Sequence, residues 1–175
     1  NPSNQYNNGY ATPFVTVMTC GTGDYDGSGN SQSEAFVKMG SVNNPEGAVA
    51  AVGMSTTGTH TAYNNIVDMG IYDGIFSKKL WYAGASVANG DLAILATYPS
   101  NPSGVTETFI AWSNLIGDPA LHLWSGVPED FAVDHPSIIS LGTTTVEIIV
   151  YNGDGELVQD ARVTLLMGDD IIFST

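Results

Sequence analysis

Apolar and polar positions follow the pattern of an α/β domain over roughly the first two thirds of the chain. Two runs are apolar without alternation, residues 13–20 and 47–53. A run that is apolar on both faces is typical of a strand in a parallel sheet that helices cover. Each run leads into a polar, turn-rich segment, residues 21–30 and 55–60. The pattern therefore predicts two buried strands whose carboxyl ends both continue into loops.

Between and after these strands, the spacing of apolar residues predicts helices. Gly40 suits the position just past the end of the first one. Asn64 and Asn65 are suited to capping a second, and Lys79 has the charge that favours a helix C-terminus. The expected segments are residues 33–40, 64–79 and 80–96 as helices, 108–112 as helical or extended chain, and 121–124 as a strand.

At residue 127 the pattern changes to one of strands and turns. Two β-rich runs, residues 143–151 and 161–167, flank an Asn-Gly-Asp-Gly segment, which predicts a hairpin-like unit. A turn at residues 168–170 leads to a short final run. About 45 residues hold only three or four such strands, too few to close a sandwich, so this domain is expected to be partial. The expected domains are residues 1–126 and 127–175.

Charge and composition limit the class of partner. Four Lys and Arg residues stand against 18 Asp and Glu residues, for a formal net charge of −14. Such a surface repels phosphate backbones and anionic lipid, and it suits calcium, cationic peptides or a salty exterior. No apolar run reaches the roughly 20 residues that a membrane span needs. The background of Asn, Ser, Thr and Gly is typical of secreted proteins, so we expect an extracellular or cell-surface location without a membrane span.

Cys20 is the single cysteine, which excludes an internal disulfide and a multi-cysteine zinc site. It ends the first apolar run, where open α/β sheets place their ligands. A nucleophilic cysteine needs an exposed thiolate, a neighbouring base and backbone N–H groups for the oxyanion. Glycines such as Gly21 let a substrate approach the backbone closely. The alternative is a small, buried and inert thiol.

The loop after Cys20 also has the composition of a calcium loop. Oxygen-bearing side chains stand at alternate positions, with Gly29 at the sharp turn. The closing glutamate comes one residue earlier than in an EF-hand, so a true EF-hand is not expected. The alternative is an acidic, polar turn without an ion. The candidate ligands are Asp24, Asp26, Ser28, Asn30 and Glu34.

Several segments in unbroken order resemble one known family. An apolar strand ends in Cys-x-x-Gly-Asp-Tyr at residues 20–25, a Gly-Ala-Val-Ala strand begins at Gly47, and Ser55-Thr56 follows it. Later comes Gly-Asp-Pro-Ala-Leu at residues 117–121. Together, over residues 5–125, these segments resemble the C-terminal half of the catalytic domain of the gingipain-like cysteine peptidases, peptidase family C25.

This resemblance implies a caspase-like α/β fold, a mostly parallel sheet covered by helices, followed by a partial all-β Ig-like sandwich. It implies that Cys20 is the nucleophile and that its backbone N–H helps to hold the oxyanion. The general base would be a histidine upstream of Asn1, so this chain alone is expected to be inactive. The substrate pocket would take its walls from the loop after the second strand. The implied substrate-binding residues are Gly21, Ser55, Thr56, Thr57 and His60.

Two classes of function remain open. The first is a secreted cysteine endopeptidase, or the nucleophile-bearing part of one, acting on peptide or protein substrates together with the upstream half of the same polypeptide. It needs no cofactor for its chemistry, although Ca²⁺ could be structural. The second is a non-catalytic extracellular binding or assembly module, whose open β domain takes a strand from a partner chain. A calcium-dependent adhesion fragment is a variant of the second.

Overall fold

A computed structural model describes residues 6–143, 145–168 and 170–174 of the chain. The chain divides into two compact units, Asn1–Ser125 and Gly126–Thr175. Each unit is described by itself.

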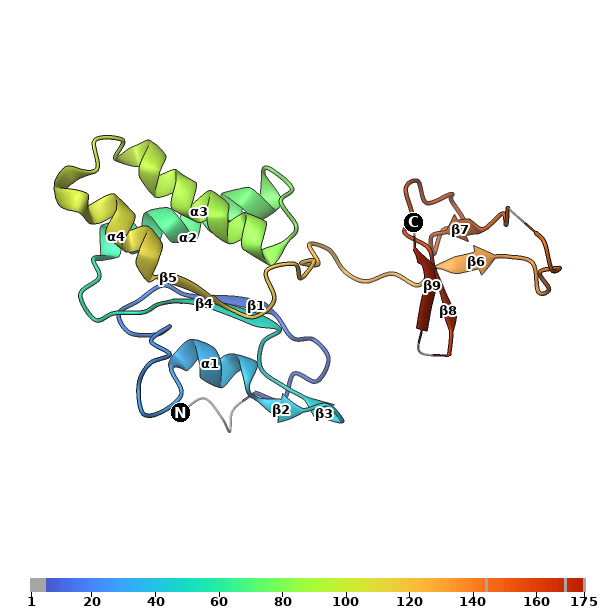
Figure 1. The fold of residues 1–175 in the computed structure, drawn as a ribbon, viewed down its shortest axis with the longest axis horizontal. Coiled ribbons are helices and arrows are strands. Elements are labelled where there is room, and N and C mark those ends of the chain that lie inside the picture. The colour runs from blue at the N-terminus through green and yellow to red at the C-terminus, as the bar shows by residue number, and fades with distance from the viewer. Residues whose placement is uncertain (1–5, 144, 169, 175) are drawn as a thin grey trace. The chain divides into compact units, whose positions relative to one another are not determined.

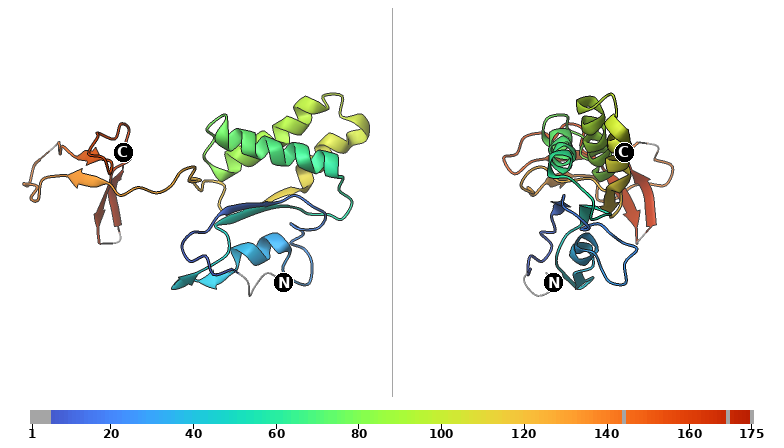
Figure 2. Two further views of the ribbon diagram at one scale, coloured as in Figure 1. Left: turned by 180° about the vertical axis from the view of Figure 1, so that it is seen from behind. Right: turned by 90° about the vertical axis from the view of Figure 1, so that its left-hand side faces the viewer.

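The first unit has a small sheet between two helical layers. Its elements are β1 (Phe14–Val17), α1 (Gln32–Val37), β2 (Gly40–Ser41), β3 (Asn44–Pro45), β4 (Ala50–Met54), α2 (Thr61–Phe76), α3 (Ala83–Thr97), the 3-10 helix η2 (Pro102–Gly104), α4 (Val105–Trp112) and β5 (Ser113–Ile116). Helices α2, α3 and α4 cover one face of the sheet and α1 covers the other (Figures 1 and 2). The layers are those of an α/β domain, as the apolar pattern predicts.

The central sheet has the order β1-β4-β5. Strands β1 and β4 are parallel, with Phe14 opposite Ala50 and Val17 opposite Gly53, so the two apolar runs are neighbouring parallel strands. All five residues of β4 are buried, because helices cover both faces of the central strand. Strand β5 is antiparallel to β4. The sheet that the described residues form is therefore mixed, and the expected mostly parallel arrangement is not confirmed.

Glycines allow the helix pair α2–α3 to pack closely. A Cβ on Gly70 would lie 2.8 Å from the Cα of Gly90, and a Cβ on Gly90 would lie 2.6 Å from the Val67 carbonyl oxygen. The buried core of this unit contains residues from α2, α3, β4 and α4, which pack against one another. Its fully buried members include Val52, Met54, Val67, Ile71 and Ile94.

Several boundaries differ from the sequence predictions. Helix α1 ends at Val37 with Lys38 as its C-cap, so Gly40 begins β2 and does not end the helix. Helix α2 ends at Phe76, before Lys79.

Helix α2 begins at Thr61, and its N-cap is His60, whose side chain accepts a hydrogen bond from the Ala62 N–H. The cap is therefore not at Asn64, which lies inside the helix and is buried. The strand expected at residues 121–124 is also wrong, since this segment forms only an isolated bridge at His122. The strand is β5 instead, and its half-buried residues lack the apolar signal that marks β4.

The second unit contains two separate pairs of antiparallel strands. They are β6 (Ala132–Asp134) with β7 (Ile149–Tyr151), and β8 (Thr164–Met167) with β9 (Asp170–Ser174). The Asn152 N–H donates to the Glu156 carbonyl, and Tyr151 bridges Leu157, so the Asn-Gly-Asp-Gly segment does turn the chain. A hairpin-like turn therefore joins residues 150–151 to residues 157–158, as expected, although strand β8 of the second run pairs with β9. Asp169, in the final predicted turn, lies outside the described residues.

Candidate active site

Cys20 lies three residues beyond β1 and is exposed to solvent. The chain turns at the next residue, Gly21, which has a φ of 68°. The Gly21 N–H donates a hydrogen bond to the Thr56 carbonyl at 2.7 Å. This bond joins the two loops that follow the parallel strands β1 and β4. No hydrogen-bond acceptor for the Cys20 N–H is found in the described part of the chain. An oxyanion-binding role for this N–H stays a prediction.

Hydrogen bonds and a close glycine–glycine contact hold the loop after Cys20 against the end of β4. The Gly23 N–H donates to the Met54 carbonyl at 2.9 Å, and the Met54 N–H donates to the Thr22 hydroxyl at 3.3 Å. A Cβ on Gly23 would lie 2.6 Å from the carbonyl oxygen of Gly53, closer than side chains permit. Thr22 itself is buried. These contacts fix the backbone on which Cys20 stands.

The sulfur of Cys20 contacts Thr59, which lies on the loop after β4 that the resemblance assigns to the pocket wall. Its Sγ lies 3.0 Å from Thr59 Oγ1 and 3.8 Å from the Thr59 carbonyl oxygen. Asn64 Nδ2 donates to Thr59 Oγ1 at 3.1 Å and to the Met18 carbonyl at 3.1 Å. Asn64 is only 4% exposed and lies on the buried stripe of α2 that continues with Val67. A polar residue at a buried helix position is the one feature of the sequence that indicates these hydrogen bonds among Asn64, Thr59 and Met18.

Of the five predicted substrate-binding residues, Gly21 follows Cys20, and the other four lie on the loop after β4, which the Gly21–Thr56 bond joins to the Cys20 loop. Thr57 is exposed, and its methyl group would lie 3.5 Å from a Cβ on Gly21. The Ser55 N–H is held by the carbonyl of the last residue of α4 at 2.9 Å. The structure brings this loop beside Cys20, and a role in binding substrate stays a prediction.

The three histidines have other partners. His60 caps α2, and its ring lies edge-on to Tyr63 with 5.9 Å between centroids. His122 lies edge-on to Tyr82, and His135 belongs to the second unit, with Nδ1 beside the Pro136 carbonyl. Both hydrogen-bond partners of the Cys20 sulfur within the described residues are atoms of Thr59. No histidine there is bonded to the sulfur.

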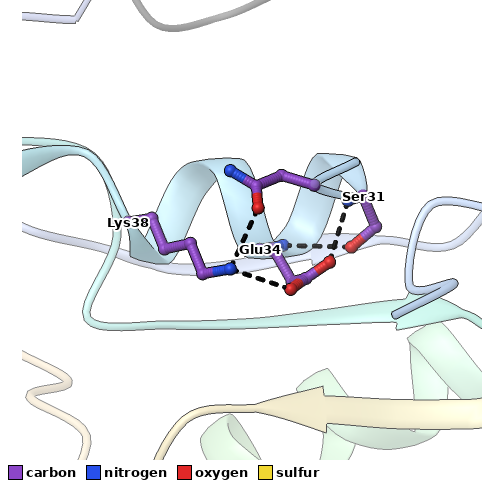
Figure 3. Close-up of polar contacts among 4 residues, drawn as sticks. Ser31, Glu34 and Lys38 are labelled. Carbon is purple, nitrogen blue, oxygen red and sulfur yellow. Dashed lines mark hydrogen bonds and ion pairs between the residues drawn. The ribbon is translucent and has the colours of Figure 1, made fainter. Parts of the chain in front are cut away.

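Glu34, the expected closing calcium ligand, is engaged elsewhere (Figure 3). Its Oε2 accepts from the Ser31 N–H at 2.9 Å, and Ser31 Oγ accepts from the Glu34 N–H, which forms a capping box for α1. Lys38 Nζ lies 3.0 Å from Glu34 Oε1 and donates to Asn30 Oδ1. The Ser31 backbone bond, followed by Lys38, lowers the pKa of Glu34. Calcium binding by Glu34 would therefore compete with Lys38 and the Ser31 N–H for the same carboxylate.

The acidic residues of the same loop interact with each other. A hydrogen bond to Asp24, and then repulsion from it, raise the pKa of Asp26. Ser28 is exposed. In the part of the chain that the structure describes, no three His, Cys, Asp or Glu side chains are grouped as a metal site. Calcium at this loop stays a prediction. Calorimetry of folded protein tests it, and binding that persists in Asp26→Ala would exclude this loop.

None of the described helices combines the length and apolar character needed to cross a membrane.

The fold is similar to that of known proteins. No curated protein matches the chain. Among solved structures, gingipain R (RgpB), an Arg-specific cysteine proteinase, is 22% identical with a TM-score of 0.70, over 92% of this chain and 38% of that one. The complex of Porphyromonas gingivalis RgpB pro- and mature domains is 23% identical, also with a TM-score of 0.70, over 86% and 37%.

At these identities the solved structures show the fold, and the chain spans somewhat over a third of their length. The sequence pattern of peptidase family C25 matches residues 1–124, which include Cys20, the Thr59 loop and the Gly-Asp-Pro segment. This match supports a cysteine peptidase. The chain belongs to peptidase family C25.

Proposed function

We propose that this chain is the nucleophile-bearing part of a secreted cysteine endopeptidase. Its family supports a cysteine peptidase, and Cys20 is its single cysteine. The observation that carries the proposal is an exposed sulfur at the carboxyl end of β1, beside a backbone N–H with no acceptor among the described residues. Nucleophile and oxyanion donor therefore belong to one residue.

In the proposed reaction the Cys20 thiolate attacks the carbonyl carbon of the scissile peptide bond. A C–S bond forms, and the carbonyl oxygen becomes an oxyanion that the Cys20 N–H stabilises. The C–N bond then breaks, and the amine leaves with a proton from the catalytic histidine. Water attacks the resulting thioester and gives a proton back to the histidine, so that the C–S bond breaks and the carboxylic acid and the Cys20 thiolate are released.

We further propose that the histidine comes from an upstream segment of the same polypeptide, as in the related family. Strand β1 pairs with β4, and its second edge has no strand partner among the described residues. Exposed apolar side chains of α2 lie close to this edge. Thr16 of β1 is 3.1 Å from the hydroxyl of Tyr72, which stacks on Phe76, and Met69 is 72% exposed. Upstream strands added beside β1 would cover this surface and complete a caspase-like sheet.

Three further parts of the proposal follow from the resemblance. The loop that contains Ser55, Thr56, Thr57 and His60 would form the wall of the substrate pocket, and Gly21 would let the substrate approach the backbone. Residues 127–175 would begin an Ig-like sandwich. The net charge of −14 suits an extracellular enzyme.

Hydrolysis assays test the proposal. The full polypeptide that contains this chain should cleave a peptide library, and Cys20→Ala should abolish cleavage. Residues 1–175 alone should show no turnover, because the histidine is supplied by the upstream segment. Full activity in Cys20→Ala would contradict the assignment of the nucleophile. Activity of residues 1–175 alone would contradict the upstream histidine.

A second candidate function is a non-catalytic binding or assembly module. It is favoured by the second unit, where each strand of the β8–β9 pair has one edge without a strand partner among the described residues. Leu166, Met167, Ile171 and Phe173 on this pair are all more than half exposed. Such edges can accept a strand from another chain. Concentration-dependent assembly by an unreactive Cys20 thiol would favour this function.

A further inference from the structure

One amide orientation gives both polar neighbours of Asn64 a donor, and it leaves the buried Oδ1 without a hydrogen-bond partner among the described residues. Met18 offers a backbone carbonyl, which can only accept a hydrogen bond. The atom facing that carbonyl must therefore be the NH₂ group. The second N–H of this group then points at Thr59 Oγ1, 3.1 Å away. Because Asn64 is buried at the first turns of α2, this orientation is held by the fold.

The donor from Asn64 decides what the Thr59 hydroxyl can do. A hydroxyl has one proton and two lone pairs. With one lone pair occupied by Asn64, the proton of Thr59 is free to point along the remaining short contact, the 3.0 Å separation from Cys20 Sγ. A thiol can instead donate to the Thr59 carbonyl at 3.8 Å, a longer contact. The hydroxyl contact is therefore the one that strengthens when the sulfur loses its proton.

We propose that the Thr59 hydroxyl donates a hydrogen bond to the Cys20 thiolate. Asn64 is the positioning residue that fixes the direction of this hydrogen bond. The proposal adds to the proposed peptidase function and rests on it for its catalytic meaning. The hydrogen bond itself depends only on the described residues. It gives the nucleophile a neutral source of thiolate stabilisation besides the histidine.

This arrangement predicts that the curves of Cys20 reaction rate against pH, with and without the hydrogen bond, cross each other. A hydrogen bond donated to a thiolate stabilises the charged form of the sulfur relative to the thiol. It also makes the thiolate less nucleophilic, because nucleophilicity falls with basicity with a coefficient of about 0.5. Losing the bond should therefore slow the reaction about threefold near neutral pH and accelerate it about threefold at high pH.

The experiment measures thiol–disulfide exchange of Cys20 with 4,4′-dithiodipyridine across a range of pH, in the full polypeptide that contains this chain. Reaction at Cys20 is quantified on its proteolytic peptide by mass spectrometry. Thr59→Val removes the hydroxyl at nearly constant shape, and Thr59→Ser restores it. Thr61→Val makes the same chemical change two residues away on the exposed first turn of α2. Thermal melting checks that each variant is folded.

We expect the curve of exchange rate against pH for Thr59→Val to cross that of the wild type. The curves for Thr59→Ser and Thr61→Val should lie close to the wild-type curve. A Thr59→Val curve that coincides with wild type, or that is displaced in one direction at every pH, overturns the proposal, because a change of access alone acts equally at all pH values. Asn64→Asp gives a second test, since a carboxylate would accept the Thr59 proton and should reproduce the crossing. Peptide hydrolysis is scored separately, so a chain without peptidase activity can still show the crossing.

Discussion

Asp91 on α3 allows us to predict how the stability of the fold changes with pH. Its Oδ1 is buried without a hydrogen-bond partner among the described residues, while the residue as a whole is half-buried. Burial raises the pKa of Asp91 from 3.8 to about 7. Between these two values the folded state binds more protons than the unfolded state. The free energy of unfolding should therefore fall as the pH rises through this interval.

The magnitude follows from the size of the pKa shift. A shift from 3.8 to about 7 sets a ceiling of about 4 kcal/mol. Because the residue is partly exposed, solvent screening reduces the expected effect to about 1–2 kcal/mol. Asp91→Asn removes the charge at nearly constant shape. The variant should therefore match wild type below pH 4 and exceed its stability by about 1–2 kcal/mol at pH 8.

Urea denaturation at several pH values, followed by tryptophan fluorescence, measures this difference. Asp73→Asn is a control of opposite sign, because bonds from Lys78 and Ser77 lower the pKa of Asp73. That variant should lose stability relative to wild type as the pH rises. An Asp91→Asn advantage that is constant with pH, or that shrinks as the pH rises, would refute the reasoning.

The remaining predictions concern the glycine contact that supports the loop after Cys20 and the N-terminal cap of α1. In Gly53→Ala the new Cβ would lie 2.7 Å from the Gly23 nitrogen, so chemical denaturation should show a loss of about 1–3 kcal/mol. An unchanged midpoint would mean that the loop yields without cost. Ser31→Ala removes the acceptor for the Glu34 N–H and should cost about 1 kcal/mol. Ser31→Asp should retain most of this stability, and equal losses in both variants would argue against the cap.

The elements that could be predicted from sequence are those with a continuous apolar signal. β1 and β4 lie within runs that are apolar on both faces, and their parallel pairing agrees with that pattern. The order of the later helices also agrees, because α2 and α3 each bury one face, which on α3 includes the polar residues Ser86 and Asn89. Strand β5 was missed because four half-buried residues that include Ser113 and Asn114 carry no such signal.

The chemistry around Cys20 could be predicted only in part. The position of Cys20 after a strand follows from local pattern, and its exposure agrees with a reactive thiol. Its contact with Thr59 does not, because the two residues are 39 positions apart and meet only when β1 and β4 pair. The cap of α2 was assigned to Asn64 because asparagine is a strong capping residue. In the fold, His60 takes that role and Asn64 turns inward to Met18 and Thr59.

The most direct test of the account is active-site labelling of Cys20. The full polypeptide that contains this chain is treated with a peptidyl acyloxymethyl ketone at neutral pH, and the intact mass and the Cys20 peptide are measured. The account predicts one covalent adduct, located on Cys20 and lost when the protein is denatured before treatment. A folded protein that never takes the probe at Cys20 would contradict a cysteine peptidase centred on this residue.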